Sequence, residues 1–404
     1  MLWYLSERCR LIYNFALAER RDKWDTEHKS ISYRKQQNDL PALKQKYPEY
    51  KCVHSKVLQM VLKTLAADYK SFFELHKVDA SARPPNFKGA KWFTTMCHNQ
   101  SGFKLTKNGT IALTQFYSKD VSLEFEIPKH ITNELFGHKL YQVNIYAKDD
   151  KFFVSVIYEE IPKEHKDTGK YLAIDQGVTK LVTAVNSSGK FFEVKNPRPD
   201  KYWNPIVDSI KSRRDHCKPY SRKRERLHNK YRECERKRSN ANIDLEHKTA
   251  RRIVDNTKAD TIIIGDLDVK KMAQPKPDKK LKHGLNRSTQ STGYLSRFAR
   301  FLTYKAELVG KKVIEIDESY TTKQCYACGK MHDMPTHVRT MKCDCGNVID
   351  RDRNSAINIM VRFLSQYAQW TSYRQFADNL RKTGLREIRE VYSQEAPRSK
   401  RISV

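Results

Sequence analysis

The stretch YLAIDQGVTKLVTAV, residues 171–185, holds two apolar runs joined by a glycine-containing turn. Short apolar runs between turn signals are typical of buried strands. Two further runs of this kind, TIIIGDL (261–267) and KKVIEID (311–317), are separated by an expected helix near residues 293–309. This succession predicts an α+β fold, in which helices pack against a sheet built from these strands.

Carboxylates lie at the ends of these runs. Asp175 ends the first strand, and Asp350 and Asp352 lie at the start of an expected helix, RDRNSAINIMVRFL. Hydrolysis of a phosphodiester by two metal ions needs several carboxylates around ions that lie about 4 Å apart, and Mg²⁺ prefers such oxygen ligands. We therefore expect a magnesium site here, completed by a third carboxylate from a neighbouring strand.

The charge of the chain predicts a nucleic-acid partner. Its 404 residues include 77 Lys and Arg against 47 Asp and Glu, a formal net charge of +30, and such cations gain affinity by releasing the counterions condensed on phosphates. An anionic membrane surface is the alternative. However, no apolar run approaches the roughly 18 residues of a membrane-spanning helix, and Glu and Arg interrupt the N-terminal stretch where a signal peptide is apolar. We expect a soluble, intracellular protein, cytoplasmic and nucleoid-associated in a prokaryotic host.

Positive charge is concentrated in an expected helical segment, residues 201–258. Charged runs are usually solvated helix faces, which is the alternative here. In residues 211–240 positive side chains outnumber acidic ones about threefold, so their mutual repulsion favours contact with phosphates. The residues expected to bind nucleic acid are Lys211, Arg213, Arg214, Arg222, Lys223, Arg224 and Arg226.

Four of the nine cysteines predict a metal site. They form two close pairs, each followed by a glycine that lets the backbone turn around an ion: Cys325, Cys328, Cys343 and Cys345. Four thiolates close the tetrahedral shell of Zn²⁺, so this zinc would be structural. His332 or His337 is the alternative for one ligand, and four free thiols are the other alternative. The remaining cysteines are interpreted as ordinary thiols.

The pattern of the N-terminal half changes near residue 90. Helical periodicity extends over residues 1 to about 85, and alternating apolar and polar residues follow from about 90 to 165. The alternating stretches are VSLEFEI (121–127), YQVNIYA (141–147) and KFFVSVIYEE (151–160). They predict a small β-barrel or sandwich.

The motifs IDQGV, SYTTKQCYACG and DRDRNSAIN, in this order, resemble the split RuvC signature of the TnpB family. These are insertion-sequence-encoded nucleases related to Fanzor proteins and CRISPR type V effectors. The likeness includes CRLIYNFAL, VHSKVLQMVLKTL, PPNFKG and NQSGFKL and covers most of residues 5–362. It implies an RNA-guided, metal-dependent DNA endonuclease of a transposable element, with a guide RNA from the element and double-stranded target DNA as partners. By motif match, Asp175 and Asp352, not Asp350, are catalytic.

The resemblance also implies a division of the chain. A helical recognition lobe (1–88) would precede a β-barrel wedge domain (89–168). An RNase H-like (RuvC) nuclease domain would follow in two parts (169–320 and 349–365), with a zinc ribbon (321–348) inserted between them. The first part would contain the basic segment and a mobile loop at 274–292, and a basic tail (366–404) would end the chain.

The chain departs from the family at one catalytic position. The family usually has a glutamate where this chain has Gly265, and glycine offers no metal ligand. Glu318 lies in the context DESYTT, where a rearranged subset that includes Fanzor proteins carries a replacement. We expect Glu318 to complete the magnesium site with Asp175 and Asp352, and Asp266 is the rival. A side chain one step along the strand points to the other face, which disfavours Asp266.

Other interpretations remain open from the sequence. Without a replacement glutamate the protein would be a nuclease-dead, RNA-guided repressor, and a zinc-stabilised RNA-binding protein without a DNA target is the third possibility. The family usually opens with a short strand, whereas this chain begins at Met1, already inside the first helix. That departure implies a misassigned start codon or a truncated copy.

Overall fold

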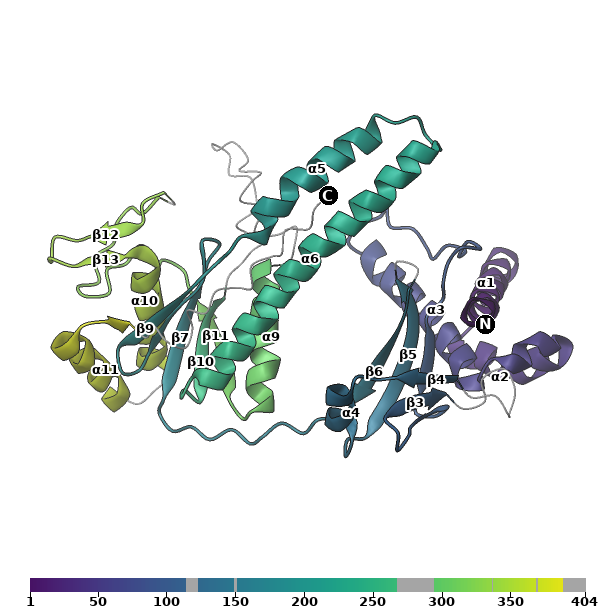
Figure 1. The fold of residues 1–404 in the computed structure, drawn as a ribbon, viewed down its shortest axis with the longest axis horizontal. Helices are drawn as coiled ribbons and strands as arrows, with labels where there is room; N and C mark the ends of the chain where they lie inside the picture. The colour runs from purple at the N-terminus through teal and green to yellow at the C-terminus, as the bar shows by residue number, and fades with distance from the viewer. Residues whose placement is uncertain (114–122, 149–150, 267–293, 336, 368–369, 388–404) are drawn as a thin grey trace. The chain divides into compact units, whose positions relative to one another are not determined.

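Residues 1–113, 123–148, 151–266, 294–335, 337–367 and 370–387 are described by the computed structural model of this chain (Figure 1). The chain divides into two units, Met1–Glu160 and Ile161–Val404. Both contain helices and strands, so the expected α+β class is confirmed. The finer division into lobe, wedge domain, nuclease domain and ribbon stays a prediction.

The first unit begins with helices, as its periodic apolar residues predict. Its helical elements are α1 (Leu2–Glu27), α2 (Tyr33–Lys46), a 3₁₀ turn η1 (Pro48–Cys52), α3 (Ser55–His76) and the short α4 (Lys129–Leu135). Leu5 and Ile12 of α1 share one apolar core with Leu58 and Leu65 of α3. Residues at this spacing lie on one face of a helix, which is why these two helices bury a common stripe.

The strands of the first unit form two antiparallel sheets of three strands each, ordered β1-β5-β6 and β2-β3-β4. They are β1 (Met96–Asn99), β2 (Phe103–Leu105), β3 (Thr110–Leu113), β4 (Leu123–Glu126), β5 (Leu140–Lys148) and β6 (Lys151–Tyr158). The expected strand 121–127 corresponds to β4, and its first two residues lie outside the described part. A closed barrel stays a prediction.

The second unit is built on a six-stranded mixed sheet of order β11-β10-β7-β8-β9-β14. Its strands are β7 (Tyr171–Gln176), β8 (Lys180–Asn186), β9 (Lys190–Lys195), β10 (Thr261–Asp266), β11 (Lys312–Asp317) and β14 (Arg386–Glu387). β7, β8 and β9 pair antiparallel, whereas β7, β10 and β11 run parallel. The parallel strands therefore end at the same edge of the sheet, where Asp175 and Asp266 lie.

Helices cover both faces of this sheet (Figure 1). One face packs against α6 (Arg222–Asn256) and α9 (Tyr294–Leu308) through residues such as Leu172, Ile174 and Ile264. The other packs against α10 (Arg351–Gln366) and α11 (Trp370–Thr383) through Ala173 and Ile263. Because side chains alternate along a strand, Asp175 belongs to the α10 face together with Ala173.

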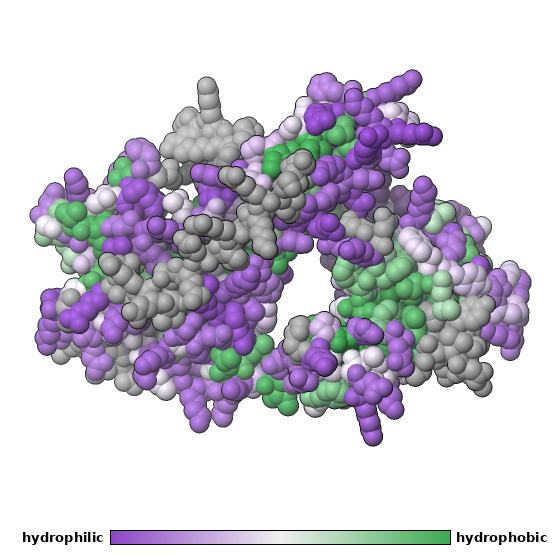
Figure 2. All heavy atoms as spheres, viewed as in Figure 1, coloured by the Kyte–Doolittle hydropathy of each residue, from purple (hydrophilic) through white to green (hydrophobic). Residues whose placement is uncertain are grey.

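A long helical hairpin accounts for the basic segment. It consists of α5 (Pro199–Asp215) and α6 (Arg222–Asn256). The N-terminal half of α6 packs on α5 through a small cluster around Val207, Ile210 and Cys234. The C-terminal half of α6 packs on the sheet through Ile253 and Val254. Hydrophilic side chains cover most of the hairpin surface that Figure 2 shows.

A short hairpin of β12 (Thr340–Lys342) and β13 (Val348–Asp350) lies just before α10. The expected loop at 274–292 lies outside the described residues. Part of the expected C-terminal tail is folded, because it contains α11 and β14, and Phe376 of α11 is buried in the core. Within the described residues, no helix is both long and apolar enough to cross a lipid bilayer.

Candidate functional site

Asp175 lies in the second unit, near the end of the central strand β7, and is buried. The Ser355 hydroxyl of α10 donates a hydrogen bond to its Oδ1 over 2.9 Å. Ser355 Oγ also lies 2.9 Å from Oγ1 of Thr321, and that oxygen lies 2.8 Å from the carbonyl of Glu318. A chain of close oxygen–oxygen contacts therefore links Asp175 to the backbone of the turn that carries Glu318.

Glu318 follows β11 directly, and its side chain lies against Gly265 of the neighbouring strand β10. A Cβ placed on Gly265 would lie 2.1 Å from Oε2 and 2.9 Å from Cβ of Glu318. The parallel register pairs Ile264 with Ile174, so Gly265 is next to Asp175 along the sheet edge. The carboxyl of Glu318 therefore occupies the space that a side chain at position 265 would take.

Burial changes the acidity of both carboxyls. It is the main cause that raises the pKa of Asp175 well above its usual value, and the nearby carboxyls of Glu318 and Asp352 act in the same direction. Burial, together with the nearby Asp266 and Asp317, raises the pKa of Glu318 to about 7. One oxygen of Glu318, Oε2, is buried and has no hydrogen-bond partner among the residues that the structure describes. A buried group of acidic oxygens with an unpartnered atom is an arrangement that a cation would stabilise.

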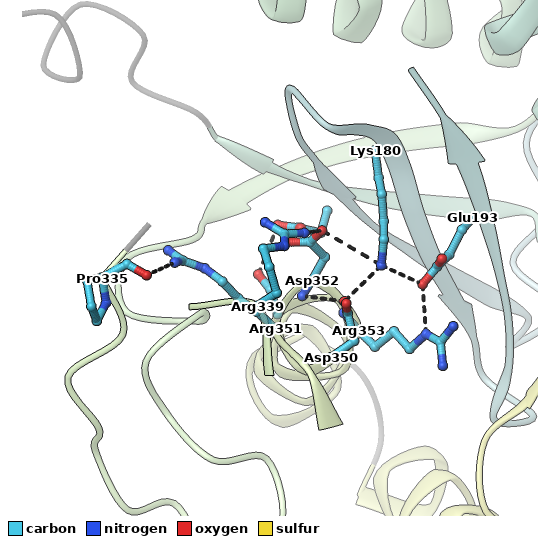
Figure 3. Close-up of polar contacts among 10 residues, drawn as sticks. Lys180, Glu193, Pro335, Arg339, Asp350, Arg351, Asp352 and Arg353 are labelled. Carbon is cyan, nitrogen blue, oxygen red and sulfur yellow. Dashed lines mark hydrogen bonds and ion pairs between the residues drawn. The ribbon is translucent and has the colours of Figure 1, made fainter. Parts of the chain in front are cut away.

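Asp352 lies in the first turn of α10, and cationic side chains contact its carboxylate (Figure 3). The guanidinium of Arg339 binds Oδ2 of Asp352, and the Lys180 ammonium lies 3.9 Å from the same oxygen. Arg339 precedes the β12–β13 hairpin, whereas Lys180 begins β8. Segments far apart in the sequence thus meet at this carboxylate.

Asp350 has a different surrounding. Its Oδ1 caps α10 by accepting hydrogen bonds from the backbone N–H groups of Asp352, over 2.9 Å, and Arg353, over 3.3 Å. Lys180 Nζ lies 2.9 Å from Asp350 and 2.9 Å from Glu193. Burial acts to raise the pKa of Asp350, but Lys180 and the two N–H groups together bring it below its usual value. Asp350 therefore acts as a helix cap held by Lys180.

Two asparagines of α10 fix the turn between Glu318 and the cysteines. The side-chain amide of Asn354 donates to the carbonyls of Thr321 and Gln324, over 3.1 Å and 2.7 Å. The amide of Asn358 donates to the same two carbonyls, over 2.8 Å and 2.6 Å. Residues four apart lie on one helix face, so both side chains reach the same turn. The position of Glu318 is thereby tied to α10, which also carries Asp352.

The four cysteines expected to bind metal come together. Their sulfur atoms all lie within 4.8 Å of one another, so the group can hold a metal ion. Sγ of Cys325 lies 3.8 Å from Sγ of Cys345, and Sγ of Cys328 lies 3.5 Å from Sγ of Cys343. The glycines after each pair, Gly329 and Gly346, have φ of 76° and 85°, a conformation that favours glycine. Neither His332 nor His337 belongs to this group.

The residues expected to bind nucleic acid lie around the turn between α5 and α6. Two of them have local partners: Arg214 lies 4.8 Å from the ring of Tyr231, and Arg224 donates to the carbonyl of Cys217 over 3.3 Å. The other five are exposed: Lys211, Arg213, Arg222, Lys223 and Arg226. The exposed residues are therefore free to contact a phosphate backbone, whereas Arg214 and Arg224 also stabilise the turn.

The sequence analysis does not single out Lys180, Glu193, Arg339 and Ser355, which lie around the expected ligands, although Ser355 falls within the motif DRDRNSAIN. For Ser355 a signal exists, because a residue three positions after Asp352 lies on the same helix face. For Lys180, Glu193 and Arg339 no local pattern predicts the contact, since it depends on how β8, β9 and the hairpin pack around α10.

Comparison with known proteins agrees with the motifs. Residues 153–276 match the protein family described as "Probable transposase", and residues 296–359 match the "Cas12f1-like, TNB domain". A protein of Streptomyces pristinaespiralis named "Putative RNA-guided DNA endonuclease" is 25% identical over 389 residues, 94% of this chain and 90% of that protein. "TnpB-like protein L79" of Acanthamoeba polyphaga mimivirus is 32% identical over 141 residues, 35% of this chain and 26% of that protein.

These matches agree with the resemblance of the motifs to the TnpB family. The first matched segment contains Asp175 and Gly265, and the second contains Glu318, the four cysteines and Asp352. The match to a solved structure described as "Cryo-EM structure of the Cas12f1-sgRNA-target DNA complex" covers 88% of this chain and 81% of the chain in that structure, with a TM-score of 0.58 and 14% identity. This likeness shows a shared fold.

Proposed function

We propose that this protein is an RNA-guided, metal-dependent DNA endonuclease with an RNase H-like (RuvC) catalytic centre. The observation that carries the proposal is the placement of the Glu318 carboxyl at Gly265, beside Asp175. It supplies an acidic group at the position where the family's usual glutamate is missing. The Streptomyces relative, named as an RNA-guided DNA endonuclease, spans nearly the whole chain.

The three carboxylates are ligands of the chemical type that divalent metal ions bind, and Asp352 would have to exchange its ion pair with Arg339 for a metal ion. Asp175, Glu318 and Asp352 would hold two Mg²⁺ ions, which prefer hard oxygen ligands. When bound, such ions activate water for in-line attack and stabilise the departing 3′ oxygen of a phosphodiester. The chain's own residues prepare the site: Ser355 orients the carboxyl of Asp175 by a 2.9 Å hydrogen bond, and Thr321 contacts both Ser355 and the backbone of Glu318.

The cysteine group supports a structural zinc. Zinc–sulfur bonds of about 2.3 Å in a tetrahedral shell place the sulfur atoms about 3.8 Å apart. The separations of 3.8 Å and 3.5 Å between Cys325 and Cys345 and between Cys328 and Cys343 fit that shell. Four thiolates leave no open position for substrate, so this ion would hold the ribbon together and take no part in hydrolysis.

A guide RNA and double-stranded target DNA are the proposed partners. The net charge of +30 and the exposed cations around the α5–α6 turn support binding of a long polyanion. In such systems base pairing with the guide selects the sequence, and the protein contacts mainly the backbone.

The decisive experiment is purification of the protein with RNA co-expressed from its element. The complex is then incubated with a plasmid library that has randomised bases beside the target, with Mg²⁺ or with EDTA. We expect cleavage of a subset of the library with Mg²⁺ and none with EDTA. Tight, RNA-dependent binding of the target without cleavage in Mg²⁺ or Mn²⁺ would instead establish the repressor alternative.

A further inference from the structure

A recess of about 420 Å³ opens on the first unit, between α1, α3 and the loop that contains the PPNFKG motif. This volume lies in the range of small-ligand pockets, roughly 300–1,000 Å³. Aromatic and cationic side chains dominate its lining: Tyr13, Phe72, Phe87, Trp92, Arg83 and Lys88. Nothing in the proposed cleavage chemistry uses these residues.

Two of the aromatic rings in this lining are about half exposed. Phe87 is 52% and Trp92 is 56% exposed. Exposed apolar side chains indicate a binding site when they gather in one place, and single ones do not. The two rings lie close together in the sequence and line the same recess, together with Phe72 and Leu75.

The loop that carries Phe87 is held firmly. The backbone N–H of Lys88 donates to Asn14 over 2.8 Å, and its carbonyl accepts from Asn14 over 2.9 Å and from Arg10 over 2.7 Å. Arg21 donates to the carbonyl of Pro85 over 2.6 Å. A rigid loop presents its rings at a small entropic cost, which favours binding.

Cations lie at the faces of these rings. Lys88 Nζ is 4.1 Å from the ring centre of Tyr13 and 5.2 Å from that of Trp92, and Arg21 is 4.9 Å from that of Phe87. Burial lowers the pKa of Lys88, although Asp68 acts in the opposite direction. Among the described residues, Lys88 makes no ion pair with a carboxylate. An anionic group of a ligand would therefore find beside the rings an ammonium that no described carboxylate neutralises.

Rings for stacking and cations for phosphate are the two components of single-strand nucleic-acid sites. Paired bases hide their faces inside a duplex, so exposed rings select an unpaired nucleotide. The one acidic residue in the lining, Asp68, accepts a hydrogen bond from the Tyr13 hydroxyl over 2.7 Å. An apolar peptide would gain nothing from Lys88 and Arg83.

We propose that this recess binds an unpaired nucleotide of the guide RNA. The base stacks on the exposed rings of Phe87 and Trp92, and the adjoining phosphate lies beside Lys88. This assignment rests on the proposed function, because that function supplies the RNA.

The test uses the full-length protein and the RNA that copurifies with it, transcribed again and labelled. Phe87→Ala and Trp92→Ala are each expected to weaken RNA binding by roughly 5- to 100-fold, the range for loss of one stacked base. The matched control is Phe136→Ala, which removes a ring of the same unit that is 48% exposed; it should leave the affinity unchanged. RNA containing 4-thiouridine should form photo-crosslinks with the peptide 84–92.

Each other outcome overturns the assignment in a distinguishable way. If Phe87→Ala and Trp92→Ala bind RNA as Phe136→Ala does, the recess takes no RNA base, although RNA-guided cleavage would still stand. If only binding of target DNA to the assembled complex weakens, the ligand is DNA. If the RNA-free variants melt at lower temperature than the control variant, the rings cover another part of the protein. If the unmodified chain binds no RNA, both this assignment and the proposed function fail.

Discussion

The side chain of Glu318 fills the space that a side chain at Gly265 would take, and the proposed chemistry depends on this placement. With Glu318 in place, a side chain at 265 would overlap its carboxyl. Gly265 does not have the positive φ that would exclude other residues, so the backbone itself tolerates a glutamate there. Either position can therefore deliver a carboxylate to the space beside Asp175, but both cannot do so together.

Exchange of the two positions tests this interpretation. Glu318→Ala should reduce cleavage by more than the roughly 10- to 100-fold that loss of an outer-shell partner costs a metal site, while RNA-guided DNA binding stays intact. Adding Gly265→Glu to Glu318→Ala should partly restore cleavage, because the new carboxyl enters the vacated space. Asp266→Ala is the control and should be nearly silent. Full activity of Glu318→Ala would remove Glu318 from the site.

The raised carboxyl pKa values predict a pH dependence of metal binding. Glu318, with a pKa raised to about 7, is largely protonated in weak acid, and a metal ion must displace that proton. Affinity for Mn²⁺ should therefore increase as the pH rises to about 8 and then level off. Titration calorimetry in buffers of different ionisation enthalpy would measure the proton released, and Glu318→Gln should release less. An affinity independent of pH would contradict the assignment.

The same carboxyl groups should make the metal-free protein less stable as the pH rises, whereas metal affinity increases with pH. A carboxyl whose pKa is higher in the folded protein than in the unfolded chain stabilises the fold. The full contribution is present at a pH below the pKa of the unfolded chain, which is about 4.5 for Glu318. That contribution is lost as the pH rises through about 7. The metal-free protein should thus lose stability over this window, and Glu318→Gln should lose less of it, as urea unfolding would show.

The sequence singles out the candidate ligands but not the residues around them. Asp175, Glu318 and Asp352 lie within motifs, and the apolar runs around them correctly predict β7, β10 and β11. Lys180 and Arg339, which contact the carboxylate of Asp352, lie outside these motifs. Their contacts depend on tertiary packing, and a single charged side chain on a strand or loop carries no periodic signal.

At the scale of elements, the α5–α6 hairpin combines two surfaces with different partners. In its C-terminal half, α6 has ion pairs within the helix, such as Lys248 with Asp244 at 2.7 Å and Arg251 with Asp255 at 3.0 Å. Around the turn, Arg222, Lys223 and Arg226 are exposed and form no ion pair among the described residues. Unpaired cations are the ones that release counterions when a phosphate replaces them.

A salt titration separates these two surfaces. The triple variant Arg222→Ala, Lys223→Ala, Arg226→Ala should weaken RNA binding and flatten the plot of log affinity against log salt by about 0.7 per lost phosphate contact. The double variant Lys248→Ala, Arg251→Ala is matched in helix and charge type and should leave the slope nearly unchanged. Equal slopes for both variants would mean that the turn is only a solvated surface.

The C-terminal elements show where sequence reasoning fails at this scale. The basic composition of residues 366–404 predicts a tail, yet β14 extends the six-stranded sheet of the second unit and α11 extends its helix layer. Phe376 is 1% exposed because it packs in the core with residues of α10. A short helix is marginal by itself in water, so its stability comes from a contact that the local sequence does not reveal.

At the scale of the whole molecule, the two units have separate apolar cores. One core includes residues of α1, α3 and the strands of the first unit. Another contains Ala173 and Ile263 of the central sheet together with Cys325, Cys343 and Ile357. The cysteine group thus belongs to the same core as the sheet that carries Asp175. Loss of its metal should therefore affect the second unit as a whole.

Removal of the metal should accordingly destabilise one unit and spare the other. We expect calorimetry of the RNA-free protein to show two unfolding transitions. Cys325→Ser or Cys343→Ser should release one zinc per chain and lower only one of them, by about 10 °C for a loss of roughly 3 to 4 kcal/mol. The control is Cys217→Ser, since Cys217 lies outside the cluster and donates to the carbonyl of Arg213 over 3.2 Å, as a serine also can. Unchanged zinc content in both cluster variants would exclude the structural site, and an equal shift of both transitions would show that the two units unfold together.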